Sequence, residues 1–256
     1  MRQKLFRASV VVVGTVLAAT LMAALVLVTA RWRVVGDTVE ATARWNDTDV
    51  VLRVSDGERQ REWQYEGSAA GQASTPGPHS RFRIGSITKT FVATVVLQLV
   101  DEGKVTLDGS IAAHLPEPIP GGDRITVRQL MNHTSGLYDY MKEPGMSTNR
   151  WRGDDRFRTH APRDLLATAV GHDPYFAPGA RFRYSNTNYI ALGLLIEHVT
   201  GHRYGDEIRD RVLTPLRLTA TTVPGEDPRV PAPALTAHRD IDGAGRVDVT
   251  AVGDFA

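Results

Sequence analysis

The sequence predicts an α+β fold, in which a β-hairpin is followed by a mostly helical region. Short apolar runs on both sides of an Asp-Gly pair at residues 56–57 predict the hairpin. Apolar residues at helical spacing from Phe91 to Val100 predict the first long helix. An uncharged N-terminal segment precedes both features, and we expect it to stand apart from the folded domain.

The composition is that of an ordinary globular protein. The 256 residues include 30 Lys and Arg and 29 Asp and Glu, for a net charge of +1, and 42% of them are hydrophobic. A net charge this close to zero gives no strong positive potential that would attract a polyphosphate, so we expect no nucleic-acid partner. The chain has no cysteine, which excludes a disulfide scaffold, a thiol nucleophile and Cys-ligated metal sites.

Residues 8–30 predict a membrane anchor or an export signal. These 23 residues carry no charge and are flanked by basic residues on both sides. A secretory apolar region is usually about 7–15 residues long, which favours an uncleaved anchor, while the small residues at 28–30 keep a cleaved signal open. We expect the N-terminus in the cytoplasm and everything after residue 30 outside it, at the cell membrane or secreted.

The sequence predicts three segments: the anchor or signal over 1–30, a polar lead-in over 31–47, and one domain over 48–256. The domain begins with the hairpin, whose strands we expect at residues 50–54 and 63–65. A strand-like run over 82–85 then leads into the long helix. Further helices are predicted at 127–132, after a Thr126 cap, and at 162–170, 188–199 and 204–213, with a surface loop at 224–233.

Ser86 and Lys89 lie three residues apart at the start of the long helix. This spacing places the hydroxyl and the amine on one face of the first turn, where they can meet. A serine hydroxyl is a weak nucleophile unless a base lies beside it, and a partly desolvated lysine can serve as that base. The alternative is a helix cap with a solvated lysine.

Tyr184 and Asn186 form a second candidate site, directly before the helix predicted at 188–199. A phenol can relay a proton, and an amide offers both a donor and an acceptor to a bound acyl group. Taken alone, this stretch also fits a turn in which Asn186 caps the next helix.

Four stretches together resemble the serine β-lactamase-related family, and most closely its secreted D-alanyl-D-alanine carboxypeptidases and class C β-lactamases. They are residues 82–89, 97–104, 125–137 and 184–188, in the order in which the family has them. The resemblance implies an antiparallel sheet flanked by helices plus an all-α region. It also implies an acyl-serine enzyme that needs no cofactor or metal.

The resemblance implies a role for each candidate residue. Ser86 would be the acylated nucleophile and Lys89 its proton acceptor. Tyr184 would protonate the leaving amine and later help to activate water, while Asn186 would hold Lys89 and the amide of the substrate. The stretch 133–136 (His-Thr-Ser-Gly) resembles a structural motif at a helix end. The sequence has no Ser-Asp-Asn box, which argues against class A β-lactamase chemistry.

The sequence departs from the family in one respect. The family completes its site with a third box, His or Lys, then Thr or Ser, then Gly, on a strand that supplies half of the oxyanion hole. No such triplet follows Tyr184. One hairpin is also little sheet for a stable fold, since two strands are marginal in water. We therefore expect the 48–256 domain to be incomplete at its C-terminal end.

Other candidate sites have simpler interpretations. His198 and His202 have the spacing of a zinc pair, but Val199 stands where such a motif needs Glu, and Gly201 ends the helix between them. We interpret Asp154 and Asp155 as a solvated charge cluster. Trp151 is either a substrate contact or a packed aromatic residue.

The sequence leaves two classes of function open. One is an exported serine hydrolase acting on D-alanyl peptides, β-lactams or small esters. The other is a catalytically silent module that binds peptidoglycan or penicillin. The intact set of Ser86, Lys89 and Tyr184 favours the enzyme, because a silent descendant has no need of a nucleophile and its base.

Overall fold

The structure is a computed structural model that describes residues 32–45, 50–55, 60–65, 79–115, 118–149, 152–241, 243 and 245–252. The chain divides into two compact units, Met1–Ser80 and Arg81–Ala256. The domain predicted over 48–256 spans this division, and its limits stay a prediction. An α+β fold is confirmed, with both strands and helices in the described parts of the chain.

The first unit contains the predicted hairpin. Strands β1 (Val50–Ser55) and β2 (Gln60–Tyr65) pair antiparallel, with Val50 opposite Tyr65 and Ser55 opposite Gln60. Exposed and half-buried residues alternate along β1, as expected when one face of a strand is covered. The predicted Asp-Gly turn at 56–57 lies outside the described residues.

The polar lead-in predicted over 31–47 contains a helix over residues 32–45. One side of this helix holds its buried residues, among them Val39 and Ala43. Its first turn contacts the hairpin, because the Trp32 ring stacks on Trp63 with 5.6 Å between the ring centres. This helix differs from the predicted lead-in without regular structure, because its charged and Thr residues interrupt the apolar ones and its buried face is narrow.

The second unit begins with the segment that carries Ser86, and here the predicted strand over 82–85 is wrong. Only Arg81 makes a β-bridge, to Ala234, and the chain then enters a 3-10 turn at Gly85–Ile87. The helix α2 (Thr88–Asp101) follows directly. A single bridge gives residues 82–85 no ladder of hydrogen bonds, so their apolar character does not produce a strand.

The predicted helices of the second unit are confirmed. Thr126 caps the first of them through a capping box with Gln129, and Gly201 ends the third in the left-handed conformation at φ 75°. They are α3 (Val127–Met131), α5 (Pro162–Val170), α6 (Thr187–Thr200) and α7 (Tyr204–Ile208), the last continued by a π-helical turn at Arg209–Leu213. The structure adds α4 (Met146–Asn149) and 3-10 turns at Ile111–Ala113, Tyr140–Lys142 and Gly153–Phe157.

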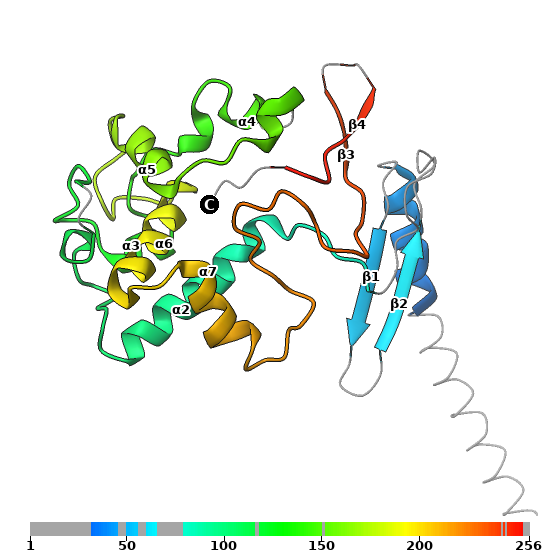
Figure 1. Cartoon of the computed structure of the whole chain (residues 1–256), viewed down its shortest axis with the longest axis horizontal. Coiled ribbons are helices and arrows are strands. Elements are labelled where there is room, and N and C mark those ends of the chain that lie inside the picture. The colour runs from blue at the N-terminus through cyan, green and yellow to red at the C-terminus, as the bar shows by residue number, and fades with distance from the viewer. Residues whose placement is uncertain are drawn as a thin grey trace, which may run out of the picture. The chain divides into compact units, whose positions relative to one another are not determined.

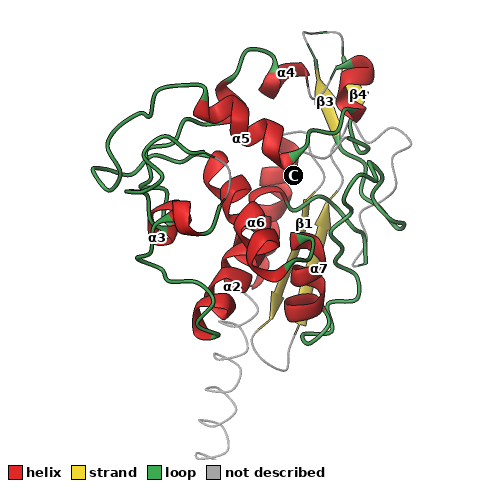
Figure 2. Ribbon diagram, turned by 60° about the vertical axis from the view of Figure 1, so that its left-hand side comes forward, coloured by secondary structure: helices red, strands yellow, loops and turns green. Residues whose placement is uncertain are grey.

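Helix α6 is the centre of the second unit. Figure 2 shows it surrounded by other helices, and it packs against α2, α3, α5 and α7. It is buried on nearly all sides, which explains why it is apolar around its whole circumference. Helix α2 contributes Val92, Val95, Val96 and Leu99 to the same core. This packing fixes the start of α2 relative to the start of α6.

Two short strands follow the helices. Strands β3 (His238–Asp240) and β4 (Arg246–Asp248) pair antiparallel as a two-stranded sheet (Figure 1). The loop predicted at 224–233 contains no helix or strand, and the carbonyl of Pro233 accepts the Arg81 N–H at 2.7 Å. The C-terminal part of the unit is thereby tied to the segment that leads to Ser86.

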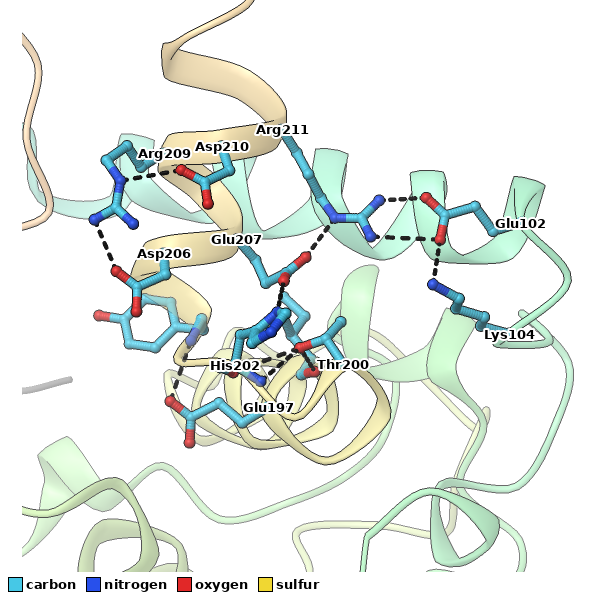
Figure 3. A network of polar contacts seen from close by, with 12 residues as sticks. Glu102, Lys104, Glu197, Thr200, His202, Asp206, Glu207, Arg209, Asp210 and Arg211 are labelled. Atoms are coloured by element: carbon cyan, nitrogen blue, oxygen red, sulfur yellow. Dashed lines mark hydrogen bonds and ion pairs between the residues drawn. The ribbon is translucent and has the colours of Figure 1, made fainter.

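Ion pairs join the C-terminal end of α2 to α7 and its π-helical continuation (Figure 3). Arg211 binds Glu102 at the end of α2 and also binds Glu207 in α7. Glu207 accepts a further hydrogen bond, 2.7 Å long, from His202 just after α6. The network therefore connects three helix ends.

Within the described ranges, no helix has both the length and the apolar character needed to cross a membrane. The anchor or signal predicted over 8–30 lies outside these ranges.

Candidate active site

Ser86 and Lys89 lie together at the start of α2. Ser86 belongs to the 3-10 turn and Lys89 to the first turn of the α-helix, with 3.4 Å between the lysine Nζ and the serine Oγ. The three-residue spacing produces this contact, since such residues are neighbours on a helix surface. The amine is thus beside the hydroxyl that it would activate.

Tyr184 and Asn186 reach the same place from the start of α6. The Tyr184 hydroxyl lies 2.8 Å from the Ser86 Oγ, and Lys89 donates to the Asn186 Oδ1 at 3.0 Å. The Tyr184 hydroxyl also donates to that Oδ1, at 3.4 Å. All four residues selected from the sequence therefore form one connected cluster, although about a hundred residues separate the two pairs.

The cluster runs from the surface into the protein. Ser86 is exposed and Tyr184 is 42% exposed, whereas Lys89 and Asn186 are half-buried. A substrate in solution can therefore reach the hydroxyl, while the groups that would handle its proton are partly shielded from water. Partial removal of water strengthens the interactions between these groups.

His133 packs against the ring of Tyr184. It follows α3 with a positive φ of 60°, and its ring packs on the Tyr184 ring with 4.4 Å between centres. Its Nδ1 accepts the Ser185 N–H at 3.3 Å. Burial, followed by the positive charge of Lys89, lowers the pKa of His133. The lowered pKa disfavours the charged imidazole, and the hydrogen bond to the Ser185 N–H agrees with a structural role for the stretch 133–136.

Asp139 lies behind Asn186, and the sequence analysis did not select it. It is only 5% exposed, and its carboxylate accepts hydrogen bonds from the backbone and the side-chain amide of Asn186. No motif in the sequence marks Asp139, because its contact with Asn186 joins residues 47 positions apart.

The remaining candidates lie in other surroundings. His202 binds Glu207 in the network at the far end of α2. Asp154 and Asp155 are exposed in the 3-10 turn at Gly153–Phe157, as expected for a solvated cluster. Trp151 lies outside the described residues.

The described strands after Tyr184 do not contain a third box. Strand β3 reads His238-Arg239-Asp240 and β4 reads Arg246-Val247-Asp248, so neither carries the triplet of His or Lys, Thr or Ser, and Gly. The first N–H groups of a helix have no partner inside the helix and can donate to a bound anion. The Ser86 N–H occupies such a position.

The sequence around this cluster matches a known family over most of the chain. The model of the Beta-lactamase family matches residues 30–254. The chain belongs to the beta-lactamase family.

Individual members of the family show how far the similarity extends. Penicillin-binding protein 4 of Amycolatopsis lactamdurans is 36% identical over 153 residues, which cover 57% of this chain and 37% of that protein. Protein flp of Staphylococcus aureus (strain MW2) is 31% identical over 149 residues, which cover 57% of this chain and 28% of that protein.

Two solved structures resemble the chain. The D-stereospecific amidohydrolase from Streptomyces sp. is 37% identical with a TM-score of 0.77, covering 85% of this chain and 64% of that one. The D-amino acid amidase from Ochrobactrum anthropi SV3, complexed with L-phenylalanine, is 28% identical with a TM-score of 0.69, covering 84% and 59%. The chain spans less than two thirds of the length of each of these four relatives.

Proposed function

We propose that this protein is an acyl-serine hydrolase that cleaves amides of D-amino acids or D-alanyl peptides. One observation carries the proposal: the exposed Ser86 hydroxyl lies 2.8 Å from the Tyr184 hydroxyl and 3.4 Å from the Lys89 amine. A nucleophile with two proton-transfer groups in contact is what acyl transfer requires. Membership of the beta-lactamase family supports the same chemistry.

Acylation uses all three groups. The Ser86 Oγ attacks the carbonyl carbon of the substrate while Lys89, acting as the base, accepts the hydroxyl proton. As the carbon–nitrogen bond breaks, Tyr184 gives its proton to the leaving amine. The product is an ester on Ser86, with Lys89 protonated and Tyr184 deprotonated. The Ser86 N–H at the helix start can donate to the developing oxyanion.

Hydrolysis of the ester restores the starting state. Tyr184, now a phenolate, takes a proton from water, and the resulting hydroxide attacks the acyl carbon. The Ser86 oxygen leaves and recovers its proton from Lys89. Asn186 keeps Lys89 in place throughout, through the 3.0 Å hydrogen bond from Nζ to Oδ1.

The substrate class is supported by the relatives. Two of the similar structures are described as a D-amino acid amidase and a D-stereospecific amidohydrolase, and a similar curated protein is described as penicillin-binding. β-Lactams and small esters are alternative substrates within the same chemistry. A silent penicillin-binding module is the second candidate function, because one of the similar curated proteins is named penicillin-binding protein 4.

A fluorescent penicillin tests the nucleophile. Membranes from cells that make the protein should show a labelled band, and Ser86→Ala should abolish it. Ser110→Ala is a matched control, because Ser110 caps a different turn and its hydroxyl donates to the Gly122 carbonyl. Fluorescent penicillin should still label this variant. Labelling that survives Ser86→Ala would remove Ser86 as the nucleophile.

The substrate is tested by comparing the two enantiomers of one amide. Release of ammonia from D-phenylalanine amide, or of D-alanine from a D-alanyl-D-alanine peptide, should exceed release from the L-forms. If penicillin labels Ser86 but no D-amide, D-alanyl peptide, β-lactam or ester is turned over, the silent module is the correct interpretation.

We also propose that residues 8–30 hold the protein at the cell membrane with its catalytic domain outside. The 23 uncharged residues between basic flanks support this placement. Fractionation should find the protein in membranes after a salt wash, open to external protease. A soluble extracellular product that begins near residue 31 would instead show a cleaved signal.

A further inference from the structure

A buried carboxylate stands behind the cluster, on the side of Asn186 away from Ser86. The Asn186 Nδ2 donates to both oxygens of Asp139, at 3.1 and 3.3 Å, and the Asn186 backbone N–H donates to Oδ1 at 3.1 Å. The opposite end of the same amide accepts the hydrogen bond from Lys89 at 3.0 Å. Asn186 therefore connects a buried anion to the amine beside Ser86.

This arrangement allows only one orientation of the Asn186 amide. If the amide turned over, its NH₂ group would point at the Lys89 amine and its oxygen at the Asp139 carboxylate. Two acceptor oxygens would then face each other at Asp139, because a carboxylate has no proton to offer when ionised. Asp139 thus determines that an oxygen, the group Lys89 needs, faces the lysine.

Further hydrogen bonds fix the position of Asp139. It accepts the Met141 N–H at 3.3 Å, and the Asp139 N–H donates to the Tyr175 hydroxyl at 3.3 Å. The next residue along the chain is tied to the start of α6, since the Tyr140 N–H donates to the Thr187 Oγ1 at 3.1 Å. A group held from several sides can impose its geometry on its neighbour.

We propose that Asp139 is a positioning residue, which fixes the Asn186 amide so that its oxygen holds Lys89 beside Ser86. This inference rests on the proposed function, because the position of Lys89 matters only if Lys89 is the base that activates Ser86. Asp139 touches neither the substrate nor the reacting atoms and acts only through Asn186. The competing explanation is purely structural: that Asp139 does no more than cap the turn at Tyr140–Lys142.

The orientation of the amide can be observed without any activity. The chain has five asparagines, so ¹⁵N labelling of their side chains in the purified protein gives a simple NMR spectrum, and Asn186→Ala identifies the Asn186 signal. In the wild type this signal should be shifted downfield and protected from exchange by the carboxylate. Asp139→Ala should move it and remove its protection. Asp139→Asn keeps an acceptor oxygen and should preserve more of both.

Ser135→Ala is the matched control. Ser135 is as buried as Asp139 and lies in the same loop, but its hydroxyl donates to Asn188 at 2.7 Å. This variant should move the Asn188 signal and leave that of Asn186 in place. Equal shifts of the Asn186 signal in both variants would mean that any damage to the loop disturbs the amide, which would overturn the proposal.

A double-mutant cycle on penicillin acylation supplies the second readout. Asp139→Ala should slow acylation about 10–100-fold in the wild type, but less than about threefold when Asn186 is already Ala. Equal losses in both backgrounds, or an unmoved Asn186 signal, would overturn the proposal. If the wild type is not acylated at all, the proposed function fails, while the NMR signals still decide whether Asp139 orients Asn186.

Discussion

Helix α2 carries a polar cluster at each end, and the two clusters differ in kind. At its start, Lys89 is the only formally charged member of a group formed with Ser86, Tyr184 and Asn186, at distances of 2.8 to 3.4 Å. At its end, Glu102 and Glu207 are both bound by Arg211 (Figure 3). One cluster has groups that can exchange protons, and the other has its charges paired.

The difference indicates what each cluster does. Charge-paired groups hold helices together and have no free donor or acceptor for a substrate. The hydroxyl groups of Ser86 and Tyr184 are each both donor and acceptor, so protons can move within the cluster with little rearrangement. We therefore expect substitutions at the start of α2 to change rates, and substitutions at its end to change stability.

The largest effect is expected at Lys89. Lys89→Ala removes the group that accepts the Ser86 proton, so acylation by penicillin should fall by about 10³-fold or more. Lys104→Ala is the control, because Lys104 binds Glu102 at the other end of α2 and should leave the rate within about twofold. Acylation of Lys89→Ala at the wild-type rate would contradict the assignment of the base.

A smaller loss of rate is expected at Tyr184. Tyr184→Phe keeps the ring on His133 but removes the hydroxyl that lies 2.8 Å from Ser86, so amide hydrolysis should slow about 10²-fold. Tyr189→Phe, which loses only a hydrogen bond to the Met131 carbonyl, should change the rate little. Similar losses in both variants would show that the Tyr184 hydroxyl has no special role.

At the other end of α2 the change should appear in stability. Arg211→Ala leaves Glu207, whose side chain is 9% exposed, without its guanidinium partner, and should lower the free energy of unfolding by about 2–3 kcal/mol. Chemical denaturation measures this loss. Arg209→Ala removes only exposed ion pairs and should unfold like the wild type. A loss of acylation without a loss of stability in Arg211→Ala would contradict the division between the two ends.

The smallest effect concerns pH. Hydrogen bonds from Arg211 and then Lys104 lower the pKa of Glu102 to about 2. Burial would raise the pKa of Glu207, but hydrogen bonds from Arg211 and His202 outweigh it and lower that pKa. Carboxyls with lowered values stabilise the folded state above their unfolded pKa, about 4.5, and this stability is lost as pH falls toward 2. The melting temperature should therefore fall below pH 4.5, and less steeply in Arg211→Ala.

Local features were predictable because their causes are local. The contact between Ser86 and Lys89 follows from the geometry of one helical turn, and Thr126 caps α3 through a residue three positions away. Helix α6 was predictable from its apolar composition and its terminal glycine. In each case neighbouring residues supply the whole interaction, so the order of the residues is enough to specify it.

Tertiary structure alone decided the rest. The hydrogen bond between Ser86 and Tyr184 joins residues 98 positions apart, and it exists because α2 and α6 pack side by side in one core. Residues 82–85 have a strand-like composition, but no ladder forms there beyond the bridge of Arg81. No sequence pattern marks Asp139, because its partner Asn186 lies 47 positions along the chain. A sequence records which groups a chain carries, but pairing and burial depend on partners that only packing brings within reach.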